Sequence, residues 1–68
     1  MDTVKIGKKL KELREKAGET QSEVAKAVNV EPMSISYYES GMRIPRDEVK
    51  IRLAEHFNSS VADIFFAD

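Results

Sequence analysis

Apolar residues recur along this chain at intervals of three and four residues, with charged residues between them. Ile6, Leu10 and Leu13 lie at positions i, i+4 and i+7, which is the spacing of one apolar stripe on a helix. Gly18 suits the left-handed backbone conformation in which many helices end. The pattern therefore predicts an amphipathic helix over about residues 3–16.

A second helix start follows directly. Thr20 and Glu23 have the Thr-x-x-Glu spacing of a capping box, in which each side chain bonds the backbone N–H of the other residue. Asn29 comes after a short apolar face, and asparagine is enriched among the non-glycine residues that adopt the left-handed conformation. We predict a second helix over residues 21–28.

A third helix begins almost at once. Pro32 stands at its first position, where the missing N–H costs nothing, and Gly41 marks its end. Ile35 and Tyr38, three residues apart, form its inward side. Two short helices joined by such a short turn are typical of a helix-turn-helix, which we predict over about residues 21–40.

The remainder of the chain predicts two more helices and no strand. Asp47 is placed to cap a helix over residues 47–57, and Asn58 suits a left-handed stop after it. Ser60 is placed to cap a last helix over residues 61–66. The chain is therefore predicted to be an all-α domain of five helices.

The composition excludes several kinds of site. The chain has no cysteine and a single histidine, which rules out a disulfide framework, a thiolate nucleophile and a cysteine or two-histidine metal site. Its three glycines are too dispersed for a phosphate-binding loop, so an enzyme is disfavoured. We expect no metal and no cofactor.

Length and hydropathy set further expectations. No run of 18 apolar residues occurs, and the N-terminus lacks the apolar stretch of a signal peptide. We expect one complete domain over residues 1–68, in the cytoplasm and without a membrane segment. The core of so small a domain rarely supplies more than about 3–5 kcal/mol, so a homodimer is favoured.

The outward face of the third helix is unusual for a surface exposed to water. It lacks the usual Glu and Lys residues and carries instead Pro32, Met33, Ser36, Tyr37 and Ser40. This mixture of small hydroxyls, one Met and one Tyr indicates selection for contact with another molecule.

The same positions carry a family resemblance. Its motifs are Thr20-Gln21-x-x-Val24-Ala25, Val28-Asn29-Val30, Ile35-Ser36-x-x-Glu39-x-Gly41 and the downstream Pro45. With this joint spacing, the chain resembles the phage-repressor (Cro-like, XRE) helix-turn-helix family over about residues 4–66. The resemblance implies a lambda-repressor-like fold and a nucleoid-associated, sequence-specific transcriptional regulator, most often a repressor. It also implies a homodimer on a palindromic operator, with helix 32–40 in the major groove of double-stranded DNA.

The resemblance places four residues on base edges: Pro32, Met33, Ser36 and Tyr37. Met33 could contact a thymine methyl group and Tyr37 could donate its hydroxyl, whereas Pro32 offers only shape. Alternatively, Met33 is merely exposed near a helix start and Tyr37 stacks on a neighbour. Because no Arg, Asn or Gln lies on this helix, we expect sequence preference to depend on thymine methyl groups and DNA shape.

Three residues are implied as phosphate contacts. Gln21 opens the second helix, whose N-terminus would face the DNA backbone. Ser40 and Arg43 flank Gly41 on the other side of the reading helix. The plainer alternatives are an ordinary polar residue in a first helical turn and a free surface arginine.

Arg14 and Glu39 are implied as a structural ion pair between the first and third helices; the alternative is two exposed, unpaired charges. His56 has no second ligand nearby and is expected at the surface or capping a helix C-terminus.

The dimer interface is predicted at the last helix, with Phe66 and Ile64 as its residues. Val61, Ile64 and Phe65 complete the stripe that closes the core, and Phe66 lies about 100° further round the helix. The alternative is a Phe66 that folds back under the C-terminus.

The net charge of -1 is unfavourable for binding nucleic acid. Basic residues nevertheless outnumber acidic ones over residues 1–26 and 42–52, on either side of the third helix. Few basic contacts imply weak non-specific binding, so useful affinity requires a dimer. A protein-interaction module, such as an antitoxin-like domain that no longer binds DNA, is the alternative that the acidic total supports.

Overall fold

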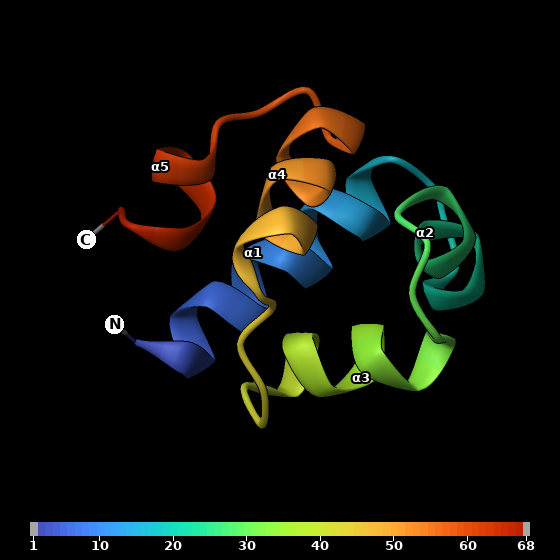
Figure 1. Cartoon of the computed structure of the whole chain (residues 1–68), viewed down its shortest axis with the longest axis horizontal. Coiled ribbons are helices and arrows are strands. Elements are labelled where there is room, and N and C mark those ends of the chain that lie inside the picture. Colours follow the sequence, from blue (N-terminus) through green and yellow to red (C-terminus); the bar gives the residue numbers. More distant parts are fainter. Residues whose placement is uncertain (1, 68) are drawn as a thin grey trace.

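The computed structural model describes residues 2–67 and confirms the predicted all-α fold. No strand occurs in this part of the chain. Figure 1 shows α3 along the lower edge of the molecule, with α1 and α4 above it and α5 above the start of α1. The helices are α1 (Thr3–Lys16), α2 (Gln21–Ala27), α3 (Pro32–Ser40), α4 (Asp47–His56) and α5 (Val61–Phe65).

The helix ends follow local chemistry. Thr20 accepts from the Glu23 N–H and Glu23 accepts from the Thr20 N–H, so the predicted capping box is confirmed. Ser60 caps α5 as predicted. The prediction for α4 was wrong: Arg46 holds the N-cap position and makes no side-chain cap bond, while Asp47 is the first helical residue. In the first turn, the negative charge of Asp47 interacts favourably with the positive end of the helix dipole and so stabilises α4 without a capping bond.

The predicted left-handed stops are also confirmed. Asn29 has φ 59° and Asn58 has φ 53°, and Gly18 and Gly41 have φ 71° and 80°. α2 and α4 themselves end one residue earlier than predicted, because the residue before each asparagine already leaves helical geometry as the C-cap. The last helix likewise ends one residue before its predicted end.

The core lies where all five helices meet. Val24, Val28 and Leu53 are almost fully buried there, and the predicted inward pair of α3, Ile35 and Tyr38, is buried with them. α3 packs against both α1 and α2, while α5 closes the other side against α4 and α1. α3 is therefore held by its inner face, which leaves its outer face free.

Gly7 brings α1 directly onto α3. A Cβ atom at this position would stand 2.3 Å from the backbone oxygen of Glu39 and 2.8 Å from that of Tyr38. No real side chain fits such distances, so the two helix backbones touch here without a layer of side chains between them.

Candidate nucleic-acid interface

The turn between α2 and α3 is closed by backbone hydrogen bonds. The N–H of Val30 donates to the oxygen of Ala25 at 2.9 Å, and the N–H of Ser34 donates to the oxygen of Glu31 at 2.9 Å. With Asn29 left-handed between them, α3 turns away from α2 and lies along the molecular edge in Figure 1. This is the arrangement predicted from the short connection.

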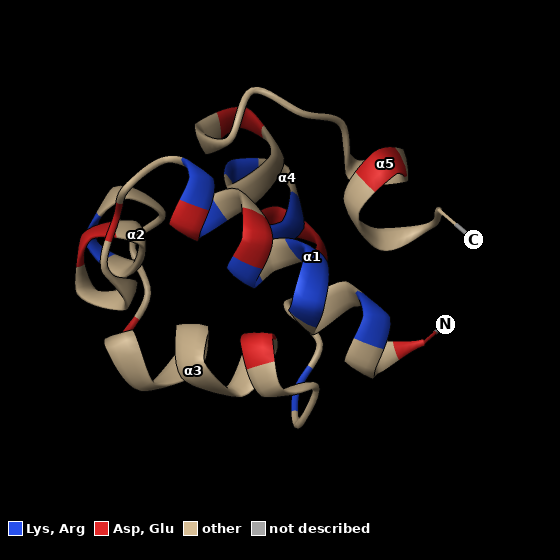
Figure 2. Ribbon diagram, turned by 180° about the vertical axis from the view of Figure 1, so that it is seen from behind, with Lys and Arg blue, Asp and Glu red and all other residues tan. Residues whose placement is uncertain are grey.

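The outer face of α3 is exposed and nearly uncharged. Met33 is 60% exposed, Pro32 is exposed, and Ser36 and Tyr37 are half-buried. Figure 2 shows basic residues on α1, in the loop after α3 and on α4, whereas α3 is largely without charge. The four residues predicted to contact bases therefore share one accessible face, with Arg43 beside Tyr37.

Tyr37 is held from the side by Arg43. The Arg43 guanidinium carbon lies 4.9 Å from the centroid of the Tyr37 ring, which is a cation–π distance. The predicted alternative, a Tyr37 that stacks on a neighbour, is therefore observed. The contact with Arg43 involves the face of the Tyr37 ring and does not use the Tyr37 hydroxyl.

Ser40 already uses its hydroxyl hydrogen. Its Oγ donates to the Tyr37 backbone oxygen at 3.1 Å. Because a phosphate only accepts hydrogen bonds, a phosphate contact by Ser40 requires its hydroxyl to rotate off this carbonyl.

The predicted Arg14–Glu39 pair is present. Arg14 donates from Nε to Glu39 Oε2 at 2.6 Å and from Nη2 to Oε1 at 3.0 Å, while its Nη1 donates to the Glu19 backbone oxygen at 3.0 Å. The two side chains are only 14% and 6% exposed. This bidentate pair joins α1 to the last turn of α3.

The hydrogen bonds that Arg14 donates to Glu39 raise the pKa of Arg14 above its ordinary value, against a smaller opposing effect of burial. A raised folded-state pKa gives stability that is complete below the unfolded-state pKa and is lost only as the pH rises through the folded one. Since both values lie far on the alkaline side, the contribution of Arg14 is constant across neutral pH.

Gln21 joins the same cluster, which the sequence did not reveal. Its Nε2 donates to Glu39 Oε1 at 3.1 Å across 18 residues of sequence, and the residue is half-buried. Gln21 thus has a partner within the protein, in addition to its predicted role toward phosphate.

His56 was expected to be a plain surface or capping residue, and that expectation was incomplete. Its Nε2 lies 2.8 Å from Glu19 Oε1, and the two side chains are 23% and 27% exposed. The contact joins the end of α4 to the turn before α2.

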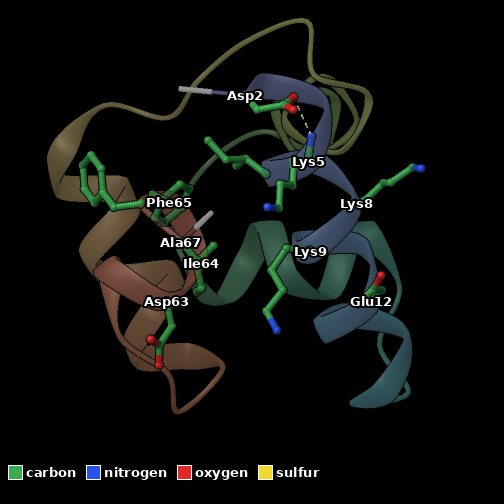
Figure 3. A pocket seen from close by; sticks show the side chains of 11 residues that line it. Asp2, Lys5, Lys8, Lys9, Glu12, Asp63, Ile64, Phe65 and Ala67 are labelled. Carbon is green, nitrogen blue, oxygen red and sulfur yellow. Dashed lines mark hydrogen bonds between the residues drawn. The ribbon is translucent and has the colours of Figure 1, made fainter.

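A groove separates the start of α1 from α5 (Figure 3). Phe66 is 61% exposed on its rim, and the Lys50 amine lies 5.5 Å from the centroid of the Phe66 ring. Ile64 is only 3% exposed, because it faces the core. Ile64 nevertheless lines the same groove as Phe66, so the assignment of both residues to a dimer interface stays a prediction.

Two further expectations concern what the described residues contain. Across residues 2–67, no group of three or more potential ligands could hold a metal ion. Within the same range, no helix has the length and apolar character needed to cross a membrane.

Known proteins share both the sequence pattern and the helix arrangement described above. The sequence model of the helix-turn-helix family matches residues 10–64. The chain is 40% identical over 55 residues to the HTH-type transcriptional regulator ImmR of Bacillus subtilis (strain 168), covering 81% of this chain and 43% of ImmR. It therefore spans less than half the length of that relative.

Two other matches cover more of their proteins. An HTH-type transcriptional regulator of Archaeoglobus fulgidus is 37% identical over 60 residues, which is 88% of this chain and 84% of the relative. The crystal structure of the clp gene regulator ClgR from Corynebacterium glutamicum superposes with a TM-score of 0.86 at 27% identity, over 97% of this chain and 70% of that one. The likeness thus extends from sequence to the arrangement of the helices.

Proposed function

Because the chain belongs to the helix-turn-helix family of transcriptional regulators, we propose that it binds a specific sequence in double-stranded DNA with α3 in the major groove. The observation that carries this proposal is the exposed, uncharged outer face of α3. A solvated surface helix would bear charges there, whereas this face bears Met33, Ser36 and Tyr37. We further propose that the five helices act as one DNA-binding domain and that the DNA-bound protein is nucleoid-associated.

The chemistry of this face favours particular base edges. Met33 supplies apolar contact, for which the thymine methyl group is the natural target in the major groove. Tyr37 supplies one hydroxyl from a ring that Arg43 braces. Since α3 offers no bidentate side chain, we infer that DNA shape contributes much of the preference.

Phosphate contacts would lie on both sides of α3. Gln21 begins α2 at one side, and Ser40 and Arg43 stand beyond the other end of the reading face. Arg43 supplies the positive charge, and few such charges imply a shallow salt dependence for each monomer.

We propose that two copies meet at the groove between α1 and α5. One wall carries Lys5 and Lys9 and the other carries Asp63, so two grooves facing each other across a two-fold axis would place opposite charges together (Figure 3). In Figure 1, α3 lies along a different side of the molecule from this groove. A dimer formed there leaves both reading helices free for DNA.

The proposed operator is palindromic, and the proposed effect is repression. Selection of bound sites from a random duplex pool tests the first point. We expect an inverted repeat with half-sites about 10 bp apart, or a nearby spacing. Enrichment of no inverted repeat contradicts the dimer, and enrichment of no sequence at all supports a protein-interaction module instead.

Substitution of Met33 by alanine tests base reading. We expect Met33→Ala to weaken specific binding by about 1–3 kcal/mol and to leave binding to random duplex almost unchanged, because an apolar base contact serves only the right sequence. Titration of both duplexes measures the difference. Met42→Ala is a matched control, since Met42 is 76% exposed outside α3. Equal losses on the two duplexes would contradict a base contact.

Substitution of Phe66 by glutamate tests the interface. An exposed Phe forfeits about 1.5–3 kcal/mol of burial, which a second copy would recover. We expect Phe66→Glu to be a monomer with much weaker DNA binding, because the apolar contact between two copies is lost. The variant should remain folded, since the nearby Lys50 amine can pair with the new carboxylate. Sedimentation at micromolar concentration and circular dichroism measure both properties.

Ile51→Glu is the control for Phe66→Glu, because Ile51 is 52% exposed on α4 and does not line the groove. It is expected to dimerise normally. If Phe66→Glu still dimerises, the interface lies elsewhere. If it unfolds, Phe66 is needed for the stability of the monomer.

A further inference from the structure

The carboxylate of Glu39 pairs with Arg14 of α1 and also accepts a hydrogen bond from Gln21, the first residue of α2. We propose that Glu39 is a positioning residue for DNA binding: it holds the Gln21 amide in place for its phosphate contact. This inference rests on the proposed function, since it assumes that Gln21 meets the DNA backbone. It assigns to the buried pair a task beyond joining α1 to α3.

The hydrogen bonds leave little freedom at Glu39. Its side chain is 6% exposed and accepts from three donors, two on Arg14 and one on Gln21. An ionised carboxylate can only accept, so the Gln21 amide must turn its NH2 group inward. One Nε2 hydrogen is used in this bond, and the other is left for a further acceptor.

Arg14 fixes the other side of the cluster. Its third nitrogen donates to the Glu19 backbone oxygen, immediately before the residue that caps α2. Glu39 itself belongs to the last turn of α3. The cluster therefore sets the start of α2, where the phosphate contact lies, in register with the helix that reads the bases.

Holding Gln21 in advance has a consequence for affinity. A free glutamine side chain loses rotamer freedom when it is fixed against a phosphate, and this loss opposes binding. A Gln21 already held by Glu39 has lost that freedom during folding. Its phosphate contact should therefore depend on Glu39, although Glu39 itself is buried away from the DNA.

Glu39→Gln tests this dependence because its amide has the same size but only one acceptor oxygen, and so cannot accept from both Arg14 nitrogens and from Gln21 in the observed arrangement. Removing one negative charge alone would strengthen DNA binding, so any loss has the opposite sign to the simple electrostatic effect. We expect Glu39→Gln to bind the selected operator about tenfold more weakly, the effect of one hydrogen bond to a charged group. Glu55→Gln is the matched control, since Glu55 is exposed on α4 and makes the same charge change. Its affinity is expected to be equal to or above that of the unaltered chain.

A second readout separates positioning from stability. Each operator phosphate in turn is replaced by an uncharged methylphosphonate. With the unaltered chain, we expect affinity to fall at the phosphate that Gln21 contacts, and we expect Gln21→Ala to abolish the effect of that one replacement. Glu39→Gln should abolish it too, and the double variant should bind no more weakly than either single one. A fully folded Glu39→Gln that keeps the same phosphate sensitivity overturns the proposal.

If Glu39→Gln does not fold, Arg14→Met with Glu39→Met takes its place. Replacing a buried ion pair by apolar residues of similar size is often neutral for stability, and it removes the acceptor for Gln21. We expect this variant to fold and to lose sensitivity at the same phosphate; retained sensitivity overturns the proposal. Failure of the proposed function is distinct, because the unaltered chain would then select no operator in the first place.

Discussion

Gly7→Ala is expected to destabilise the protein by about 3 kcal/mol, at the upper end of the cost of overpacking a core. The new Cβ would stand 2.3 Å from the Glu39 backbone oxygen, so α1 and α3 must move apart. Helix propensity alone favours alanine over glycine by about 1 kcal/mol, which means that the expected sign is opposite to the propensity effect. Urea unfolding monitored by circular dichroism measures the change.

Gly18→Ala is the matched control for this substitution. Gly18 has φ 71° and nothing within 4 Å of a built Cβ, so its cost is backbone strain alone, about 1–2 kcal/mol. If Gly7→Ala proves as stable as the unaltered chain, the close contact between α1 and α3 is not present in solution.

Arg14→Ala is expected to be as damaging, by about 3 kcal/mol, because it leaves the Glu39 carboxylate buried without its main partner. A core of this size supplies about 3–5 kcal/mol in total, so the variant should keep only about 0–2 kcal/mol and unfold at a much lower temperature. A double-mutant cycle with Glu39 in thermal unfolding measures the coupling. We expect the loss to be the same at any neutral pH, since the raised pKa of Arg14 keeps it charged throughout.

Arg46→Ala is the control for charge removal. Arg46 and Glu48 lie 3.8 Å apart with side chains 80% and 62% exposed, a pair expected to contribute little. A change within about 0.5 kcal/mol is expected there. A cycle for Arg14 and Glu39 with no coupling outside error would mean that the two side chains do not pair.

The helices were predictable because their signals are local. A capping box such as Thr20 with Glu23, or a left-handed stop such as Asn29, depends only on residues within one turn. The pairing of Arg14 with Glu39 came only from the family resemblance, since nothing in the spacing of 25 residues indicates it. The residues on the outer face of α3 could be predicted because Ile35 and Tyr38 were correctly assigned to its buried side.

Other contacts were beyond the reach of sequence reasoning. The bonds of Gln21 to Glu39 and of His56 to Glu19 depend on how separate helices approach each other. Ile64 and Phe66 show another limit, because Phe66 is the C-cap of α5 and has left helical geometry. Helical spacing therefore does not predict that both residues line the groove between α1 and α5.

The contact at Gly7 has an implication for how this protein can diverge. Where two helices meet through interlocking side chains, each exchange of a core residue shifts the helices by a fraction of an ångström, and such shifts accumulate over evolutionary time. Here α3 rests on the α1 backbone at Glu39 and Tyr38, and a backbone has the same dimensions whatever its sequence. The core can therefore change its residues while α3 stays in place, and the residues on the outer face of α3 remain free to change independently.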